Sequence, residues 1–395
     1  MSLLPVAEAL ARIVSGAKLM AAEDVPLARA MGRVLAAALK ARRDQPPFDA
    51  SAMDGYAMIA GDGPDLRLIG TSAAGHRYKG AVKRGEAVRI LTGAPLPKGA
   101  DAVIIQENVV AQDGRIICRE PVHTGQNLRA RGLDFTKGEY LIPAHTRLNA
   151  RDLSLAAAMN CETVRVRMTP HVVVFATGDE LVEPGAKPNA DQIVSSNSTA
   201  LAALAGYFGA RVTNLGIVRD DLRATIGAIR KAADADILLT TGGASVGDHD
   251  YVQDALKAAG VKVDFWKIAM RPGKPFMYGR KGRQHVLGLP GNPVSAQVCA
   301  RLFLLPLLSA MVGLPPPAEA TAILGSPMKA NDSRQDYVRA TLQTSADGTR
   351  VATPFARQDS SMQRTFREAQ ALIIRPPHAL EATAGTTVPV LLMDF

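Results

Sequence analysis

The sequence predicts a multidomain protein in which a central α/β domain with a mostly parallel sheet is combined with two β-rich parts. Three observations lead to this class. A chain of 395 residues is long enough for two to four domains. Residues 170–312 alternate between β-branched runs and amphipathic segments, which is typical of a parallel sheet covered by helices on both faces. Short β-like runs between glycines and prolines stand on either side of that region.

The N-terminal part of the chain is expected to be helical first and β-rich afterwards. Apolar residues recur at helical spacing within residues 1–45. Four of them share one helix face: Val6, Ala9, Leu10 and Ile13. Runs such as EAVRIL and ADAVIIQENVV then alternate with glycines and prolines, so residues 46–145 are expected to form a β-rich domain.

The α/β region has a regular order of expected elements. Strands are expected at HVVVFAT, RVTNLGIV, DILLTT and VKVDFWKIAM, and helices at STALAALAGYFGA, DDLRATIGAIRKAADA and DYVQDALKAAG. FMYGRKGRQHVLGL is expected to be a hairpin, which brings the P-G-x-P turns at 272–275 and 290–293 together. The apolar run 302–314 is too short to cross a bilayer and is expected to be a buried helix.

The end of the chain is expected to be a separate β domain. Consecutive prolines at 315–317 indicate a stiff linker. Beyond the linker, the runs DYVRATLQT, TRVATPF, ALIIRP and TTVPVLL have the composition of short strands.

Composition and charge exclude several classes of protein. The content of 47% hydrophobic and 21% charged residues is ordinary for a globular protein. The net charge of +9 favours anionic ligands, but the basic residues are scattered and indicate a solvated surface rather than nucleic-acid binding. Three widely separated cysteines fit reduced thiols in a cytoplasmic protein. Glu8 within the first apolar stretch argues against a signal peptide, and no membrane partner is expected.

Four polar loops follow the expected strands. In an open parallel sheet, ligands bind beyond the carboxyl ends of the strands. The loops at that edge are rich in glycine, acids and hydroxyl groups: TGDE (177–180), RDD (219–221), TTGGASVGDHD (240–250) and MRPGK (270–274). Their coincidence predicts a ligand site.

Three acids from these loops, Glu180, Asp220 and Asp250, are expected to converge. Carboxylates buried together repel one another, and a divalent cation removes the conflict. Mg²⁺ suits carboxylates combined with substrate phosphates, while the loop glycines would hold phosphate oxygens. Alternatively, each acid is a helix N-cap, because Asp220 and Asp250 directly precede expected helices.

Two cations are expected beside the N-terminus of the helix that follows the second proline turn. Arg271 and Lys274 belong to the first turn, and Ser295 is expected near the N-cap of that helix. Helix dipole and fixed cations together would form an oxyanion pocket. The alternative is a pair of proline turns that only stiffen the loops.

Other motif interpretations are weaker. GASVG (243–247) matches the G-x-S-x-G nucleophile elbow, but Gly247, Asp248 and His249 separate Ser245 from the helix, which disfavours a serine hydrolase. The loop is neither a Walker A motif nor G-x-G-x-x-G, which disfavours an ordinary NTPase or dinucleotide enzyme.

Six segments, in family order over nearly the whole chain, resemble the MoeA and gephyrin E-domain family of molybdopterin molybdenumtransferases. They are PPFDASAMDGYA, ILTGAPLP, TGDEL, TTGGASVGDHDYV, MRPGKPF and GLPGNPVSA. The α/β part alone is also similar to the molybdopterin adenylyltransferases.

The resemblance implies a division of the chain into four parts. These are an elongated linking segment (1–45 and 146–170, of which helix 1–20 is expected to pack on the α/β domain), a β-rich domain (46–145), a three-layer α/β domain (171–312) and a C-terminal β-barrel-like domain (318–395). The family forms homodimers in which the β-rich part of one subunit faces the α/β site of the other.

The implied reaction takes molybdate and adenylylated molybdopterin to molybdenum cofactor, with Mg²⁺-dependent release of AMP. A molybdopterin adenylyltransferase is then a possible partner. The implied catalytic residues are Asp54, Thr92, Asp134, Glu180, Asp220 and Asp250, the last two also binding the metal. The implied substrate-binding residues are Gly242, Gly243, Ser245, Gly247, Arg271, Lys274, Pro290, Asn292, Pro293, Arg339 and Ser360.

Two positions depart from the family pattern. Ala50 stands where asparagine is common, and Arg271 replaces a frequent lysine. Alternative functions are a non-catalytic molybdopterin-binding scaffold and a paralogue for another oxyanion such as tungstate. The combination of acids and cations, without a long disordered segment, favours the enzyme over the scaffold.

Overall fold

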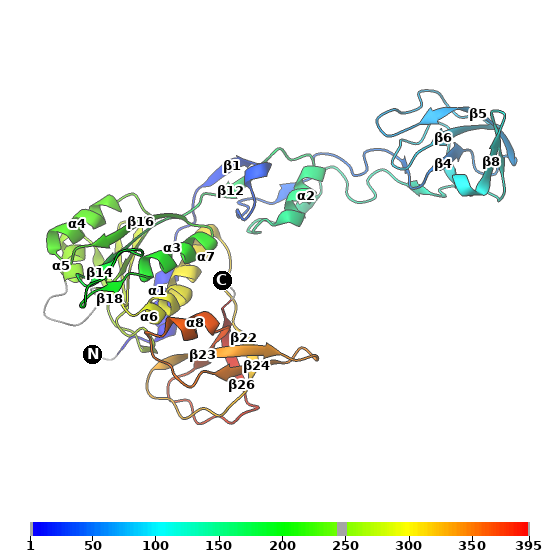
Figure 1. Ribbon diagram of the computed structural model, residues 1–395. Helices are drawn as coiled ribbons and strands as arrows, with labels where there is room; N and C mark the ends of the chain where they lie inside the picture. Colours follow the sequence, from blue (N-terminus) through cyan, green and yellow to red (C-terminus); the bar gives the residue numbers. More distant parts are fainter. Residues whose placement is uncertain (1–2, 243–250, 394–395) are drawn as a thin grey trace. The chain divides into compact units, whose positions relative to one another are not determined.

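The computed structural model describes residues 3–242 and 251–393, and these form two compact units (Figure 1). One unit is Asp24–Val166. The other combines Met1–Glu23 with Arg167–Phe395 and contains both the α/β domain and the C-terminal β domain.

The α/β domain is built on a six-stranded sheet with the order β16-β13-β17-β21-β20-β18. Its strands are β13 (His171–Thr177), β16 (Arg211–Val218), β17 (Ile237–Thr241), β18 (Lys262–Phe265), β20 (Met277–Lys281) and β21 (Gln284–Leu289). β13 pairs in parallel with β16 and β17, and β17 with β21, whereas β20 runs antiparallel to both of its neighbours. The mostly parallel sheet predicted from the sequence is therefore present.

Helices cover both faces of this sheet (Figure 1). The helices are α1 (Val6–Ser15), α3 (Asn197–Tyr207), α4 (Leu222–Lys231), α5 (Tyr251–Ala258), α6 (Pro293–Cys299) and α7 (Leu305–Val312). Val172 and Val174 of β13 pack with α1, α3, α6 and α7, while Val173 and Phe175 pack with α4 and α5. Alternating strand residues thus fill two cores, as expected for a strand buried on both sides.

The expected buried helix is longer than the sequence suggested. α6, a π-helical turn (Ala300–Leu304) and α7 form one 20-residue helix, Pro293–Val312. By length and composition it could span a membrane, yet 89% of its apolar window is buried inside the protein. The wide turn precedes Pro306, whose ring would otherwise clash with the backbone one turn earlier.

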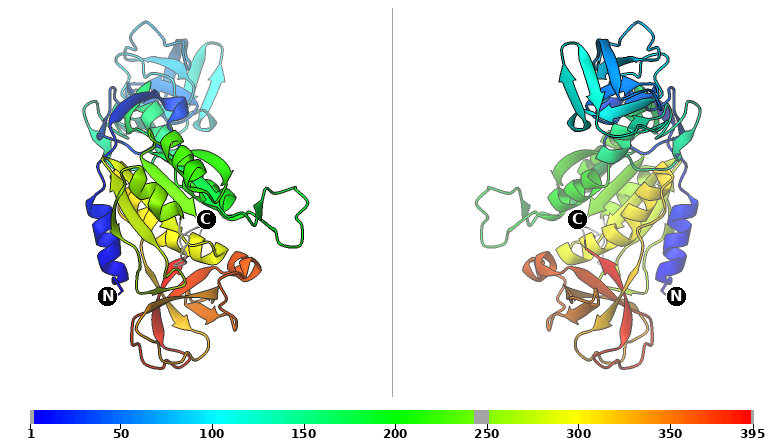
Figure 2. Two further views of the ribbon diagram at one scale, coloured as in Figure 1. Left: turned by 90° about the vertical axis from the view of Figure 1, so that its left-hand side faces the viewer. Right: turned by 90° about the vertical axis from the view of Figure 1, so that its right-hand side faces the viewer.

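The N-terminal helix belongs to the same core. Val6, Ala9 and Ile13 of α1 are buried there, and Leu10 is partly buried against it. Figure 2 shows α1 running along the side of the α/β domain. The strands β14 (Leu181–Val182) and β15 (Ile193–Val194) pair in parallel at the base of an exposed loop of the same domain.

One expected strand is interrupted. VKVDFWKIAM was predicted to be continuous, but β18 ends at Phe265, and β19 (Met270–Arg271) pairs with β23 of the C-terminal domain. The reason is competition for backbone hydrogen bonds. Ala269 N–H donates to Leu4 O (2.8 Å), and Ala269 O accepts from Gln335 N–H (2.9 Å), so other segments hold the chain away from the central sheet.

The C-terminal domain is a closed five-stranded barrel, in agreement with the prediction. Its elements are β22 (Ala320–Leu324), β23 (Gln335–Thr344), β24 (Arg350–Pro354), α8 (Gln363–Glu368), β25 (Ala371–Arg375) and β26 (Thr387–Leu392). Val338, Ala340 and Ile373 lie in the barrel core. α8 lies against α6 of the α/β domain (Figure 2).

The second unit contains a six-stranded sheet with the order β7-β4-β6-β5-β9-β8. The strands are β4 (Gly55–Met58), β5 (Asp65–Ser72), β6 (Glu86–Ile90), β7 (Ala102–Ile105), β8 (Val109–Gln112) and β9 (Arg115–Cys118). Shorter elements complete it: β1 (Ala22–Pro26) with β12 (Thr163–Arg167), β2 (Leu39–Lys40) with β11 (Tyr140–Ile142), β3 (Ala50–Ser51) with β10 (Leu128–Arg129), and α2 (Ala150–Ala158). The β-rich secondary structure predicted for this part of the chain is present. The exact domain boundaries stay a prediction.

Candidate active site

Hydrogen bonds tie three loops together at the carboxyl edge of the central sheet. Asn197, the first residue of α3, donates from Nδ2 to Thr241 Oγ1 (2.9 Å) and to Gly291 O (2.7 Å). Thr241 Oγ1 in turn donates to Pro290 O (3.1 Å). The end of β17, the start of α3 and the second proline turn therefore form one connected structure.

Only a glycine fits at the start of the glycine-rich loop. Gly242 has a φ of +88°, and a Cβ built on it would lie 2.2 Å from Thr177 O at the end of β13. The loop thus leaves β17 pressed against the neighbouring strand. The other predicted residues of this loop, Gly243, Ser245, Gly247 and Asp250, lie outside the described residues, and their roles stay predictions.

Acidic residues gather at the same edge of the sheet. Asp221 caps α4 by accepting a hydrogen bond from Ala224 N–H (2.8 Å). The alternative interpretation, in which Asp220 is the N-cap of this helix, is therefore wrong. Burial raises the pKa of Asp220, and the negative charges of Asp179 and Glu180 raise it further. Glu180 thus acts electrostatically on Asp220, while the third acid of the predicted group, Asp250, lies outside the described residues.

Asp179 is a third acid that the sequence analysis missed. Its Oδ1 accepts from the backbone N–H of Asp220 (3.3 Å). Its position in the loop TGDE, directly after β13, could have identified it from the sequence. Within residues 3–242 and 251–393, no group of three or more His, Cys, Asp or Glu side chains is arranged to hold a metal ion.

Residues of the barrel meet the second proline turn. Asn292 donates from Nδ2 to Ser360 Oγ (2.8 Å), and Val294 N–H donates to Ser360 O (3.0 Å). Asn292 occupies the N-cap position of α6 and Pro293 the first turn, a position that proline favours. Ser295 is buried one residue beyond Val294, so it is not the cap. Asn292, Pro293 and Ser360, which the sequence analysis proposed separately, are brought together.

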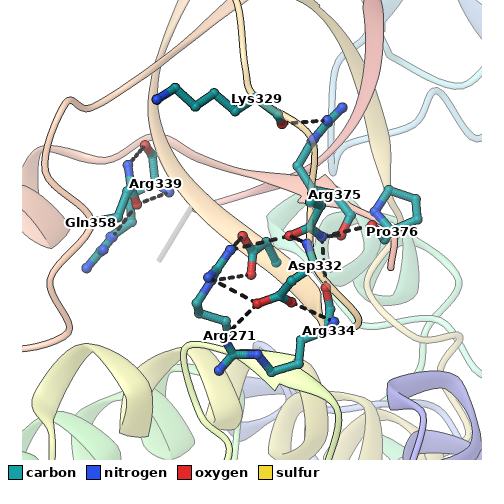
Figure 3. A network of polar contacts seen from close by, with 10 residues as sticks. Arg271, Lys329, Asp332, Arg334, Arg339, Gln358, Arg375 and Pro376 are labelled. Carbon is teal, nitrogen blue, oxygen red and sulfur yellow. Dashed lines mark hydrogen bonds and ion pairs between the residues drawn. The ribbon is translucent and has the colours of Figure 1, made fainter. Parts of the chain in front are cut away.

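A buried arginine is hydrogen-bonded to the residues that precede Ser360, and Figure 3 shows it beside Gln358. The Arg339 side chain on β23 is only 1% exposed, and burial lowers the pKa of its guanidinium. It donates from Nε to Gln358 Oε1 (2.9 Å) and from Nη1 to Asp359 O (2.7 Å). Among the described residues no carboxylate forms an ion pair with it. Its cation is therefore held in place without an ion pair, and the negative charge of Asp359 offsets part of the effect of burial on the pKa of the guanidinium.

The two cations of the first proline turn differ in their surroundings. Lys274 is exposed, and no carboxylate of the described chain pairs with it. Arg271 instead faces acids of the barrel (Figure 3). It donates from Nε to Asp336 Oδ1 (2.6 Å) and from Nη2 to Asp336 Oδ2, while Nη1 lies 3.5 Å from Asp332 Oδ2.

The β-rich unit contributes a separate polar cluster. Asp54 Oδ1 accepts from Thr92 N–H (2.6 Å) and Thr92 Oγ1 (2.7 Å), and these bonds lower the pKa of Asp54. Arg89, which the sequence analysis missed, adds a smaller effect in the same direction. Its guanidinium stacks over the Tyr56 ring, 5.5 Å from the centroid.

Asp134 is not part of that cluster. Its backbone N–H donates to Gln45 O (2.9 Å), and its side chain is exposed. No hydrogen bond of the described residues connects it to Asp54 or Thr92. The structure thus joins two of the three residues predicted on this unit.

Comparison with known proteins gives consistent matches along the chain. Three family models match: the MoeA N-terminal region (domain I and II) over residues 4–160, a probable molybdopterin binding domain over residues 173–310, and the MoeA C-terminal region (domain IV) over residues 321–393.

Relatives and solved structures match over most of their length. A molybdopterin molybdenumtransferase of Nostoc sp. is 38% identical over 74% of this chain and 70% of its own. One of Haemophilus influenzae is 33% identical over 93% of both chains. The crystal structure of a molybdopterin biosynthesis MoeA protein from Pyrococcus horikoshii has a TM-score of 0.82 and 29% identity, covering 99% of this chain and 100% of that one.

Proposed function

The chain belongs to the MoeA family of molybdopterin molybdenumtransferases, and from that membership we propose that it transfers molybdenum from molybdate to adenylylated molybdopterin, with Mg²⁺-dependent release of AMP. The observation that carries this proposal is the junction of Arg339, Ser360 and Asn292. A buried cation that forms no ion pair among the described residues, and that is bonded to the carbonyl preceding Ser360 at the N-terminus of α6, is suited to an oxyanion.

Molybdate, as a substrate dianion, is proposed to bind at this junction. Arg339 and Lys274 supply positive charge, and the hydroxyl of Ser360 and the amide of Asn292 supply hydrogen bonds. Pro290 and Pro293 keep the turn in shape. Oxygens must leave the molybdate as the dithiolene sulfurs bind, and cations already in place stabilise that movement of charge without reorganisation.

The pyrophosphate of the substrate is proposed to bind at the carboxyl edge of the sheet. Backbone N–H groups of the loop that starts at Gly242 would hold its oxygens. The acids fit Mg²⁺ by their chemistry, because carboxylates that repel one another gain from a shared cation. Asp220 would hold it, together with Asp250 by prediction, with Glu180 close by. When bound, Mg²⁺ would neutralise charge on the pyrophosphate.

A cytoplasmic homodimer with a shared site completes the proposal. Asp54, Thr92 and Asp134 would serve the α/β site of a second copy. A molybdopterin adenylyltransferase would supply the adenylylated substrate. The hydrogen bonds from Thr92 support the role of Asp54 as a carboxylate that stays ionised at neutral pH.

Release of AMP from adenylylated molybdopterin tests the function directly. We expect AMP only when both molybdate and Mg²⁺ are supplied. Arg339→Lys keeps the charge but loses the planar fork, so the molybdate concentration at half-maximal rate rises by about tenfold. Arg350→Lys, on the exposed end of β24, is the matched control and is expected to behave like the wild type. Release of AMP at the same rate without molybdate would exclude the proposed reaction.

A further inference from the structure

The proposed oxyanion pocket crosses the boundary between two domains. Asn292 and Lys274 belong to the α/β domain, whereas Arg339 and Ser360 belong to the barrel. Groups that act on one small anion must keep their positions to a fraction of an ångström. The pocket therefore depends on what fixes the barrel to the α/β domain.

Arg271 stands at that boundary. Its strand, β19, leaves the α/β domain and joins the barrel sheet, with Met270 opposite Gln335 and Arg271 opposite Asp336. The guanidinium meets both oxygens of Asp336, and Asn331 Oδ1 accepts a further hydrogen bond from Nη2 (3.3 Å; Figure 3). A two-point contact between planar groups fixes orientation as well as distance.

The faces of β23 separate Arg271 from the pocket. Val338 and Ala340 point into the barrel core, and Asp336 shares their face because strand residues alternate. Tyr337 packs in the core of the α/β domain, and Arg339 shares that opposite face. Asp336 and Arg339 are also three residues apart, about 10 Å along a strand. An arginine bound to Asp336 is thus directed away from the groups around Arg339.

Charge leads to the same conclusion. The Asp336 side chain is 12% exposed, whereas Arg271 is 48% exposed. To offer an anion its Nε and Nη2 fork, Arg271 would have to leave Asp336, and a largely buried carboxylate would remain unpaired, which is costly.

We propose that Arg271 and Asp336 form a clasp that positions the barrel, and that Lys274 and Arg339, without Arg271, provide the cations for the oxyanion. The inference rests on the proposed function and gives Arg271 a different role from the one expected from the sequence. Asp336 becomes a positioning residue that acts through the placement of Arg339 and Ser360.

Charge reversal separates a clasp from a direct ligand. The variants are Arg271→Asp, Asp336→Arg and the two combined. Each single variant places like charges opposite each other, and we expect the molybdate KM to rise by about tenfold. This increase is smaller than for a fully buried pair, because Arg271 is half exposed. The double variant rebuilds the pair in reverse, and its KM is expected to return to within about threefold of the wild type. Asp332→Asn, at an exposed acid 3.5 Å from the same arginine, is the control and should change KM less than twofold.

A direct ligand gives the opposite pattern. Asp at position 271 would then repel molybdate whatever stands at position 336, so a double variant no better than Arg271→Asp overturns the clasp. Asp336→Asn adds a second criterion, because freeing a direct ligand would lower the molybdate KM. Under the clasp, Asp336→Asn raises it.

Amide hydrogen exchange in β23 and β25 provides a reading that does not depend on turnover. We expect faster exchange there in both single variants and near wild-type exchange in the double variant. If the wild type released no AMP, the proposed function would fail while the exchange pattern still tested the clasp. Unchanged exchange in Arg271→Asp would overturn the clasp even in an active enzyme.

Discussion

Replacement of Asn197 by alanine tests whether the loops at the carboxyl edge act as one unit. The change removes the hydrogen bonds to Thr241 Oγ1 and Gly291 O. Each is worth about 1 to 1.5 kcal/mol, so the α/β domain should lose about 2 to 3 kcal/mol of unfolding free energy. The loss is not larger because Thr241 keeps its bond to Pro290, and the Gly291 carbonyl belongs to an exposed residue that water can reach.

Trp266 offers a local probe for this measurement. It is the single tryptophan of the chain and packs against the core beneath α4 and α5. With a urea m-value of about 2 kcal/mol/M, the midpoint followed by its fluorescence should fall by about 1 M. Asn214→Ala is the matched control, because Asn214 bonds only locally, to Gly216 N–H, in an exposed position. A midpoint for Asn197→Ala equal to that of Asn214→Ala would refute the reasoning. The molybdate KM should also rise, since the turn that carries Asn292 is released.

Three further predictions concern single positions. Gly242→Ala should destabilise the α/β domain by about 3 kcal/mol, because φ is +88° and the new Cβ meets Thr177 O, and an unchanged urea midpoint would contradict this. Thr92→Val removes one of the hydrogen bonds that lower the pKa of Asp54, so the acidic limb of the pH–rate profile should move to higher pH. An acidic limb at the same pH as in the wild type would exclude a catalytic role for ionised Asp54. Burial lowers the pKa of His285 to about 4, so the unfolded chain binds more protons than the folded chain between pH 6.5 and 4. The free energy of unfolding should therefore fall by up to about 3 kcal/mol as the pH falls through that window. Urea titrations of His285→Gln should show a weaker pH dependence.

Sequence reasoning worked best where the relevant contacts are local. The alternation of β-branched runs and amphipathic helices identified the sheet, because both periods are visible within each segment. It could not decide which of two adjacent aspartates caps α4. Asp221 and Asp220 differ only in their backbone geometry, which the sequence does not display.

The interruption of the strand after Phe265 could not be predicted, for a different reason. Met270 and Arg271 have a sequence compatible with the central sheet, but their partners are Gln335 and Asp336, 65 residues further along. A pairing between residues so far apart in the sequence does not change the hydrophobic pattern around either residue. Lys274, three positions away, is exposed and forms no ion pair among the described residues, so neighbours in one motif differ in their surroundings.

Arg339 shows why the barrel contributes to the pocket. A buried cation without a paired carboxylate costs free energy, and close packing alone would favour an apolar side chain at that position. Gln358 Oε1 and Asp359 O each accept one of its guanidinium N–H groups yet leave its charge in place. An anionic substrate gains most from such a group, because the surrounding protein screens it far less than water would. Under the proposed function, the stability lost at Arg339 is the counterpart of affinity for an oxyanion, and the proposed clasp at Arg271 keeps that cation near the turn at Asn292.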